Sequence, residues 1–222
     1  MTKKTVLLTG ASRGIGKAIA ERLRIEYDIL APSRRELDLS NDTSIREFSV
    51  NIRKRNVDIL INNAGINYPQ WIDETTEENI QETFQVNLIA PIKLVRAVVP
   101  NMKIRRWGRI VNVSSAFGIV ARGKQVLYTA TKHGIIGATK SLALELAKDN
   151  ILVNAICPGF ANTDLVVSKN TQEKIAKLLE DVPLKRLIEP NEIAELIAFL
   201  VSEKNTAITG ACIVIDAGFT IH

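Results

Sequence analysis

Near its N-terminus the chain carries the segment Val6-Leu7-Leu8-Thr9-Gly10-Ala11-Ser12-Arg13-Gly14-Ile15-Gly16. The apolar run at its start predicts a buried strand, and the residues after the glycines predict a helix. Glycines between a strand and a helix permit a tight turn and let a phosphate approach the backbone closely. The free N–H groups and the positive dipole end of that helix favour the same phosphate. The segment therefore predicts a nucleotide-binding turn, although a turn that binds no ligand can have this spacing.

The rest of the chain alternates short apolar segments with longer helical ones. The predicted strands lie near 5–9, 28–31, 58–61, 108–114, 151–156 and 211–215. The predicted helices lie near 14–24, 41–54, 75–99, 127–148, 170–180 and 191–202. Apolar strands that alternate with helices are typical of a parallel sheet covered on both faces. We therefore expect an α/β fold, a doubly wound parallel sheet (Rossmann fold), with residues 1–222 forming one domain. Ligands of such sheets bind beyond the carboxyl ends of the strands, where we expect to find Gly10, Asn63, Ser115 and Pro158.

Length and composition fit a globular protein of one domain. The chain has 222 residues, of which 46% are apolar and 24% charged, and a net charge of +5. We find no stretch long enough to span a bilayer and expect no membrane partner. The two cysteines, Cys157 and Cys212, do not suggest a disulfide framework, so we expect a cytoplasmic protein. Histidine occurs only at His133 and His222, which argues against a metal site.

Tyr128 and Lys132 stand four residues apart, with Ser115 thirteen residues before the tyrosine. On a helix, positions i and i+4 share a face, so the phenol and the ammonium can point into one cleft. A neighbouring cation favours the phenolate, and we expect it to lower the pKa of Tyr128. Tyr128 could then exchange a proton with a substrate, while Ser115 holds a carbonyl oxygen.

These motifs together resemble those of the short-chain dehydrogenase/reductase family, and the resemblance runs nearly end to end. It includes Asn62-Asn63-Ala64-Gly65, Asn87, Pro158-Gly159 with Thr163, and Ile208-Thr209-Gly210. The resemblance implies a nicotinamide-dependent oxidoreductase with Tyr128 as general acid/base and a homotetrameric assembly. It implies that Lys132 binds the nicotinamide ribose and that Asn87 holds a water of a proton relay. Asn87 could instead be a helix-interior amide that satisfies backbone groups.

The predicted cofactor-binding residues come from four parts of the chain. They are Gly10, Ser12, Arg13, Gly14, Ile15 and Gly16 in the turn; Ser33, Arg34, Asp38 and Leu39 after the second strand; Asn63, Ala64 and Gly65; and Tyr128, Lys132, Pro158, Gly159, Ala161 and Thr163 near the nicotinamide. By resemblance, Asp38 and Leu39 recognise adenine.

The segment from Pro32 to Leu39 departs from the family pattern. The family places a full crossover helix between its second and third strands, but Leu37-Asp38-Leu39 already looks like the end of a third strand. We therefore expect a short extended connection instead of that helix. No acid ends the second strand, whereas Ser33, Arg34 and Arg13 could bind a 2′-phosphate, so NADP(H) is favoured over NAD(H). Arg35 could equally be part of a solvated turn.

The substrate is less constrained. The segment 165–183 resembles the mobile lid of 3-oxoacyl-(acyl-carrier-protein) reductases, which indicates an acyl thioester, but a small ketone, sugar or cyclic alcohol stays open. A non-catalytic dinucleotide sensor usually loses part of the Ser/Tyr/Lys set, which this chain keeps. A nucleic-acid-binding protein would suit the basic charge, but the chain has no aromatic stacking platform, so we expect no nucleic acid partner.

Overall fold

A computed structural model of the chain describes residues 3–163, 166 and 171–221. Its centre is one six-stranded parallel sheet with the strand order β2-β1-β3-β4-β5-β6. The strands are β1 (Thr5–Leu8), β2 (Asp28–Leu30), β3 (Ile59–Asn62), β4 (Gly108–Val113), β5 (Ile151–Pro158) and β6 (Cys212–Ile215). All neighbouring pairs are parallel. The predicted doubly wound sheet is confirmed, and the six predicted strands lie where they were expected.

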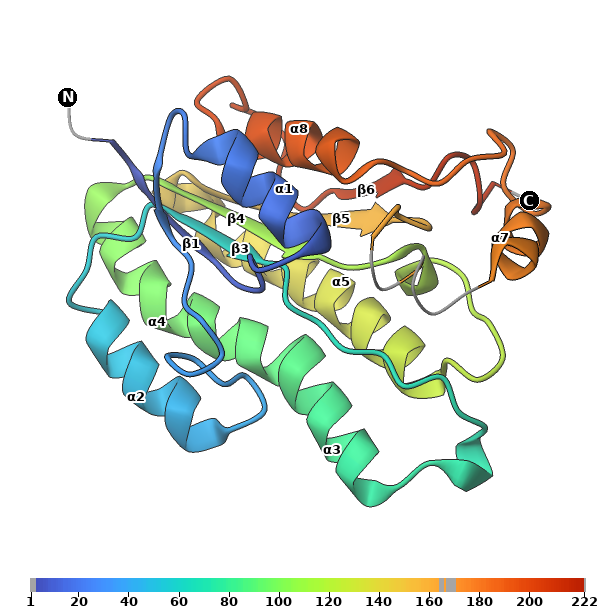
Figure 1. Cartoon of the computed structure of the whole chain (residues 1–222). Coiled ribbons are helices and arrows are strands. Elements are labelled where there is room, and N and C mark those ends of the chain that lie inside the picture. The colour runs from blue at the N-terminus through green and yellow to red at the C-terminus, as the bar shows by residue number, and fades with distance from the viewer. Residues whose placement is uncertain (1–2, 164–165, 167–170, 222) are drawn as a thin grey trace.

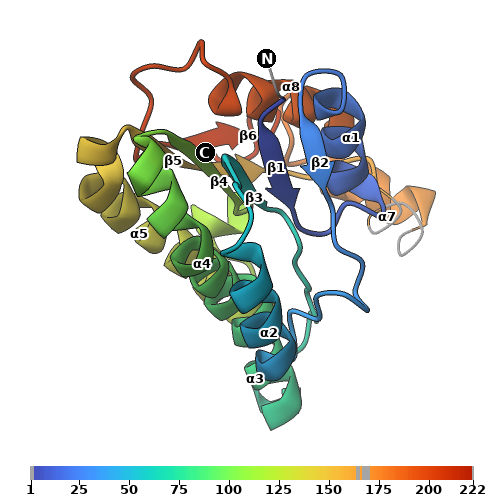
Figure 2. The same ribbon diagram turned by 90° about the vertical axis from the view of Figure 1, so that its left-hand side faces the viewer.

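Helices cover both faces of this sheet (Figure 1). Helices α1 (Gly14–Leu23) and α8 (Pro190–Val201) lie on one face. Helices α2 (Asp42–Ile52), α4 (Ala90–Arg105) and α5 (Val126–Leu146) lie on the other. Figure 2 shows the two layers end-on, with the sheet between them. The remaining helices described are α3 (Glu77–Phe84) and α7 (Gln172–Leu179), together with short helical turns.

Side chains alternate between the two faces of the sheet along each strand, so each strand contributes to the core on both faces. In β1, Val6 and Leu8 pack towards α1 and α8, whereas Leu7 packs towards α2 and α4. Successive side chains of a strand point to opposite faces, so a strand buried on both sides must be apolar throughout. This requirement explains the unbroken apolar runs in the sequence.

Leu37-Asp38-Leu39, which looked like the end of a further strand after β2, forms no strand, and that expectation is wrong. A parallel neighbour for β2 requires a crossover of about a dozen residues or more, and residues 31–36 are too few. The chain instead makes a turn in which the backbone N–H groups of Glu36 and Leu37 donate to the Ser33 carbonyl. Leu37 is buried in the α2 layer, and β2 becomes the edge of the sheet. As expected, no helix lies between β2 and Leu37, although the connection there is a turn and not extended; α2 is the helix that leads on to β3.

The predicted helix at 75–99 is also different in the structure. It begins as α3, widens into a π-helical turn over Gln85–Ile89, and continues as α4 to Arg105. Asn87 lies in that widened turn and is buried. π-Helical turns of this kind are rare and occur frequently at functional sites. The predicted helix within the lid segment is confirmed as α7, while residues 164–165 and 167–170 lie outside the described residues.

Candidate active site

The glycine turn connects β1 to α1 at the carboxyl end of the sheet. Gly10 and Gly14 have positive φ angles of 70° and 52°, which side chains rarely adopt. A Cβ atom on Gly16 would lie 2.0 Å from the Gly10 carbonyl oxygen, so only glycine fits there. Arg13 caps α1 without a side-chain hydrogen bond, and the first turn carries no acid. The turn therefore leaves backbone N–H groups and a positive helix end that fit the pyrophosphate of a dinucleotide.

Asn63, which directly follows β3, connects this turn to that strand through hydrogen bonds. Its side-chain amide donates to the carbonyl oxygens of Thr9 (3.0 Å) and Gly10 (3.1 Å). The Thr9 hydroxyl accepts hydrogen bonds from the backbone of Asn63 and Ala64, each at 3.1 Å. The two predicted cofactor-binding segments, one after β1 and one after β3, are thus held together by hydrogen bonds.

Ser115, Tyr128 and Lys132 converge beyond β4. Ser115 is buried two residues after the end of β4, and its Oγ accepts a hydrogen bond from the Phe117 backbone (3.1 Å). Tyr128 and Lys132 lie one turn apart on α5, with Lys132 Nζ 5.4 Å from the centroid of the tyrosine ring. The Ser115 side chain lies close enough to the Tyr128 phenol to lower the pKa of that phenol. The three residues that the sequence singled out are therefore neighbours in space.

Backbone contacts hold Lys132 in place. Its Nζ donates to the Val113 carbonyl at 2.8 Å, and its own carbonyl accepts from the Ser114 hydroxyl at 2.9 Å. The side chain is only 4% exposed. A Cβ atom on Gly65 would lie 3.5 Å from Lys132 Nζ, so the Asn63-Ala64-Gly65 segment approaches the lysine closely.

The buried amide of Asn87 links the π-helical turn to this cluster. Its Oδ1 accepts from the Ile66 backbone N–H (2.9 Å), and its Nδ2 donates to the Ile66 carbonyl (2.9 Å) and the Thr131 hydroxyl (3.3 Å). Thr131 directly precedes Lys132. These contacts match the alternative in which the Asn87 amide satisfies backbone groups, and they place it beside the lysine at the same time.

The protonation of the pair differs from the prediction. Burial raises the pKa of the Tyr128 phenol, and the nearby Ser115 side chain opposes that rise. Burial also lowers the pKa of the Lys132 ammonium to about 8. The prediction that Lys132 lowers the tyrosine pKa is wrong for this structure, because the desolvation of both groups dominates. At neutral pH the phenol therefore carries its proton.

The nicotinamide end of the predicted site lies at the ends of β5 and β6. A Cβ atom on Gly159 would lie 2.8 Å from the Asp216 Cα, so the two strand ends are closely packed. Ala161 forms an isolated bridge with Ile188. The Thr163 Cγ2 would lie 3.1 Å from a Cβ atom on Gly14. Thr163 therefore lies over the start of α1, and the segment that follows Pro158 closes the same edge of the sheet as the glycine turn.

A family model described as enoyl-(acyl carrier protein) reductase matches residues 25–220. The chain is 37% identical to the 3-oxoacyl-(acyl-carrier-protein) reductase of Vibrio cholerae serotype O1, over 97% of this chain and 96% of that protein. The chain belongs to the short-chain dehydrogenase/reductase family.

Solved structures agree with this assignment. The 4-hydroxyisoleucine dehydrogenase complexed with NADH superposes with a TM-score of 0.94 at 30% identity, covering 99% of this chain and 100% of that one. ElxO with NADP bound superposes with a TM-score of 0.91 at 29% identity, covering 100% of both chains. The resemblance deduced from the motifs is confirmed, and this short-chain dehydrogenase/reductase is an NAD(P)-dependent oxidoreductase.

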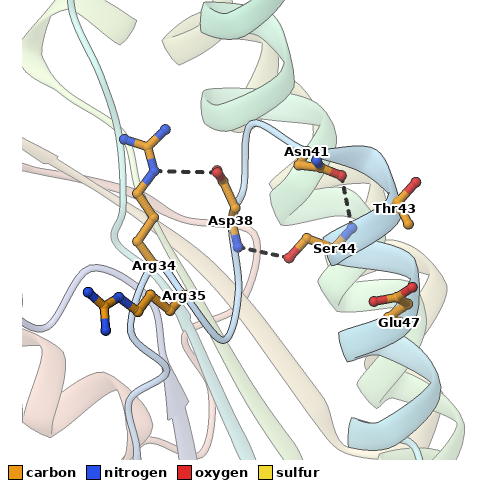
Figure 3. A pocket seen from close by; sticks show the side chains of 7 residues that line it. All are labelled: Arg34, Arg35, Asp38, Asn41, Thr43, Ser44 and Glu47. Atoms are coloured by element: carbon orange, nitrogen blue, oxygen red, sulfur yellow. Dashed lines mark hydrogen bonds and ion pairs between the residues drawn. The ribbon is translucent and has the colours of Figure 1, made fainter.

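The residues predicted to bind the adenosine lie between the β2 edge and α2. Here a hollow of about 730 Å³ is lined by Arg34, Arg35, Asp38, Asn41, Thr43, Ser44 and Glu47 (Figure 3). Arg34 Nε points to Asp38 Oδ2 at 3.4 Å, and Asp38 Oδ1 accepts from the backbone and the hydroxyl of Ser40. Hydrogen bonds from the Ser40 hydroxyl and backbone and the charge of Arg34 lower the pKa of Asp38 despite its partial burial. Leu39 packs against the α2 layer of the core.

Two features of this dehydrogenase were missed in the sequence. Glu36 folds back so that its Oε2 accepts from both the backbone N–H and the hydroxyl of Ser33, each at 2.8 Å. The spacing Ser-x-x-Glu is that of a capping box and could have indicated this contact. An aromatic cluster adjoins the predicted catalytic residues: Phe117 packs edge-on against Tyr128, Phe160 and Phe219, with centroids 6.1–6.5 Å apart. These aromatic residues are far apart in the chain, so their spacing carries no local signal.

The described helices include none that is long and apolar enough to cross a membrane. Within the described residues, no group of three or more His, Cys, Asp or Glu side chains is arranged to hold a metal ion.

Proposed function

We propose that this chain is an NADP(H)-dependent reductase of a carbonyl compound, with Tyr128 as the proton donor to the carbonyl oxygen. The observation that supports it most is the convergence of Ser115, Tyr128 and Lys132 at the sheet edge that carries the glycine turn. A raised tyrosine pKa keeps the phenol protonated at neutral pH, which suits a proton donor. In our proposal the whole chain, residues 1–222, acts as one catalytic domain.

Each polar group has a role in this proposal. Bound NADPH supplies the hydride that the reaction needs. Ser115, which lies near the phenol, orients the substrate oxygen beside Tyr128. Lys132 stabilises negative charge on the phenol and binds the nicotinamide ribose. Asn87 fixes the segment at Ile66 and connects it to α5 through Thr131, which supports a relay that returns protons to Tyr128.

The cofactor-binding residues that we propose are those predicted from the sequence. They are Gly10, Ser12, Arg13, Gly14, Ile15, Gly16, Ser33, Arg34, Asp38, Leu39, Asn63, Ala64, Gly65, Tyr128, Lys132, Pro158, Gly159, Ala161 and Thr163. A preference for NADP(H) over NAD(H) is supported by Arg13, Ser33 and Arg34, which are exposed at the turn and after β2. Guanidinium groups match a phosphate in charge and geometry. The ratio of kcat/KM for NADPH and NADH tests this preference, and a clear excess for NADH would remove it.

For the substrate we propose a 3-oxoacyl thioester. The similarity to the Vibrio cholerae reductase supports this choice, as does the net charge of +5, which suits an acidic acyl carrier. The rings of Phe117, Phe160 and Phe219 beside Tyr128 offer an apolar surface to an acyl chain. NADPH consumption measured with acetoacetyl thioesters and with a panel of small ketones, sugars and cyclic ketones tests the choice. Consumption with a small ketone alone would favour the second candidate, a reductase of small carbonyl compounds.

We also propose that the enzyme is a cytoplasmic homotetramer. The apolar residues Ile135, Ile136 and Leu146 of α5 are buried within the monomer, but Leu144 on the same helix is 85% exposed. Ile89, Ile92 and Ile104 of the neighbouring helical segment are exposed as well. Burial of such apolar surface drives association, and light scattering gives the mass directly. Both cysteines are free thiols, as expected of a reducing compartment.

A further inference from the structure

The contact between Ser33 and Glu36 lies where a dinucleotide fold recognises the ribose 2′ position. Ser33 follows β2, which pairs with the β1 strand that leads into the glycine turn. In dinucleotide folds, the residue that contacts the 2′-hydroxyl or 2′-phosphate lies about 20 residues after the glycines. Residues 33–36 occupy this stretch of the sequence.

The Ser33 donors already hold an anion. The backbone N–H and the hydroxyl of Ser33 both point to one oxygen of Glu36, each at 2.8 Å. These hydrogen bonds, led by that of the backbone, lower the pKa of the Glu36 carboxyl, so it is ionised at neutral pH. Two donors that converge on one acceptor are what a phosphate oxygen requires.

A local capping role explains only part of this arrangement. In a capping box the serine hydroxyl accepts a hydrogen bond from the N–H three residues on, and the glutamate accepts from the serine N–H. Here the Glu36 N–H donates to the Ser33 carbonyl instead, and the Ser33 hydroxyl donates to the Glu36 carboxylate. The hydroxyl is therefore oriented as a donor to an anion, as it would be toward a phosphate.

The neighbouring arginine is engaged in the same way. Arg34 Nε contacts Asp38 at 3.4 Å across the hollow in Figure 3, so an acid also partners the guanidinium proposed for the phosphate. Among the described residues, Arg13 and Arg35 have no hydrogen-bond or ion-pair partner on their side chains. Of the polar side chains near the proposed 2′-phosphate position, those of Ser33 and Arg34 therefore contact acidic side chains. Those of Arg13 and Arg35 do not.

We propose that the Glu36 carboxylate sets the cofactor selectivity of this enzyme by occupying the Ser33 donors that the 2′-phosphate of NADP(H) would take. NADP(H) must displace this carboxylate, because two anions cannot share the same donors without repulsion. NAD(H) need not displace it, since a carboxylate can accept a hydrogen bond from the ribose 2′-hydroxyl. Glu36 therefore reduces the ratio of the affinity for NADP(H) to the affinity for NAD(H). The inference rests on the proposed preference for NADP(H), which Ser33 and Arg34 would provide.

Two adenosine fragments isolate this effect from catalysis. 2′,5′-ADP and 5′-AMP differ only in the 2′-phosphate, and their dissociation constants are measured by calorimetry with the wild type, Glu36→Gln and Glu47→Gln. The first variant removes the negative charge of the group that accepts hydrogen bonds from Ser33. The second is the matched control, because Glu47 is exposed on the α2 wall of the same hollow, whereas the Ser33 donors point to Glu36. The same proteins are then titrated with NADPH and NADH.

We expect Glu36→Gln to bind 2′,5′-ADP and NADPH about fivefold more tightly, the scale of one solvent-screened charge interaction. Its affinity for 5′-AMP should stay within about twofold. Glu47→Gln should change the affinity for neither ligand by more than about twofold, since its exposed charge is screened by salt and does not accept from the Ser33 donors. An unchanged 2′,5′-ADP affinity in Glu36→Gln would overturn the inference. An equal gain for 5′-AMP, or an equal gain in Glu47→Gln, would overturn it as well.

The proposed cofactor preference is tested separately, by the wild-type affinities. If the wild type binds NADH more tightly and Glu36→Gln still gains affinity for 2′,5′-ADP alone, the proposed preference fails and the role of Glu36 stands. If the wild type prefers NADPH and the variant does not change, the preference stands and the role of Glu36 fails.

Discussion

The two ends of the proposed cofactor site are built differently. At the catalytic end, Ser115, Lys132 and Asn87 are buried, and backbone groups of Phe117, Val113 and Ile66 hold their side chains through hydrogen bonds. At the adenosine end, Ser33, Arg34 and Glu36 are exposed, and their contacts lie within one turn of the chain. Buried polar groups that are fully hydrogen-bonded are positioned rigidly, whereas exposed charges are screened and adjust easily. Changes at the first end should therefore alter turnover strongly, and changes at the second should alter cofactor affinity modestly.

The largest effect is expected for Tyr128→Phe. The loss of a general acid should lower kcat at least about 100-fold, while the dissociation constant for NADPH should change by no more than about twofold. Steady-state kinetics and fluorescence titration measure the two quantities. The matched control is Tyr27→Phe, which removes a phenol just before β2, at the opposite end of the strands. Equal decreases of kcat in Tyr128→Phe and Tyr27→Phe would show that the Tyr128 hydroxyl is not the general acid.

Gly16→Ala tests the glycine turn that joins the two ends. The added Cβ would lie 2.0 Å from the Gly10 carbonyl oxygen, so the backbone must move. We expect NADPH affinity to fall about 30-fold, which corresponds to roughly 2 kcal/mol, together with a lower melting temperature. In the control Gly137→Ala, within α5, the Cβ meets nothing within 4 Å. Replacing a helical glycine in this way should stabilise the protein by about 0.5–1 kcal/mol. Normal NADPH binding by Gly16→Ala would mean that the turn does not hold the pyrophosphate.

The pH dependence of reduction should depend on Lys132. Because burial lowers the pKa of this ammonium to about 8, it loses its charge above that pH, and kcat/KM for carbonyl reduction should then decrease. Lys132→Arg should be roughly tenfold less active, since a guanidinium fits the site poorly, but it stays charged. Its pH profile should therefore lack the decrease near pH 8. An identical decrease in the variant would assign the titration to another group.

The smallest effect is expected for Arg34→Ala at the adenosine end. Loss of one exposed guanidinium should raise the KM for NADPH about fivefold and leave that for NADH nearly unchanged, the scale of a screened ion pair. Arg53→Ala, which removes an equal charge after the end of α2, is the control. If Arg34→Ala raised the KM values for NADPH and NADH equally, Arg34 would act on the conformation of the segment and not on the 2′-phosphate.

The same contrast explains how far the sequence could predict the molecule. The strands, the helices and the convergence of Gly10, Asn63, Ser115 and Pro158 at one sheet edge were predictable, because apolar periodicity and strand ends are local properties. The missing strand at 37–39 could have been excluded by the crossover length alone. The π-helical turn around Asn87 and the raised pKa of Tyr128 depend on tertiary packing. No pattern of neighbouring residues encodes either of them.

A single-turnover experiment tests most directly the claim that the catalytic end performs carbonyl reduction through Tyr128. Enzyme saturated with NADPH is mixed rapidly with an excess of an acetoacetyl thioester or of the best ketone in the panel, and NADPH absorbance is followed. The wild type should consume its bound NADPH in one fast phase, and Tyr128→Phe should do so at least about 100-fold more slowly at equal cofactor occupancy. Equal rates in the two proteins, or no consumption by the wild type with any carbonyl compound, would contradict the account.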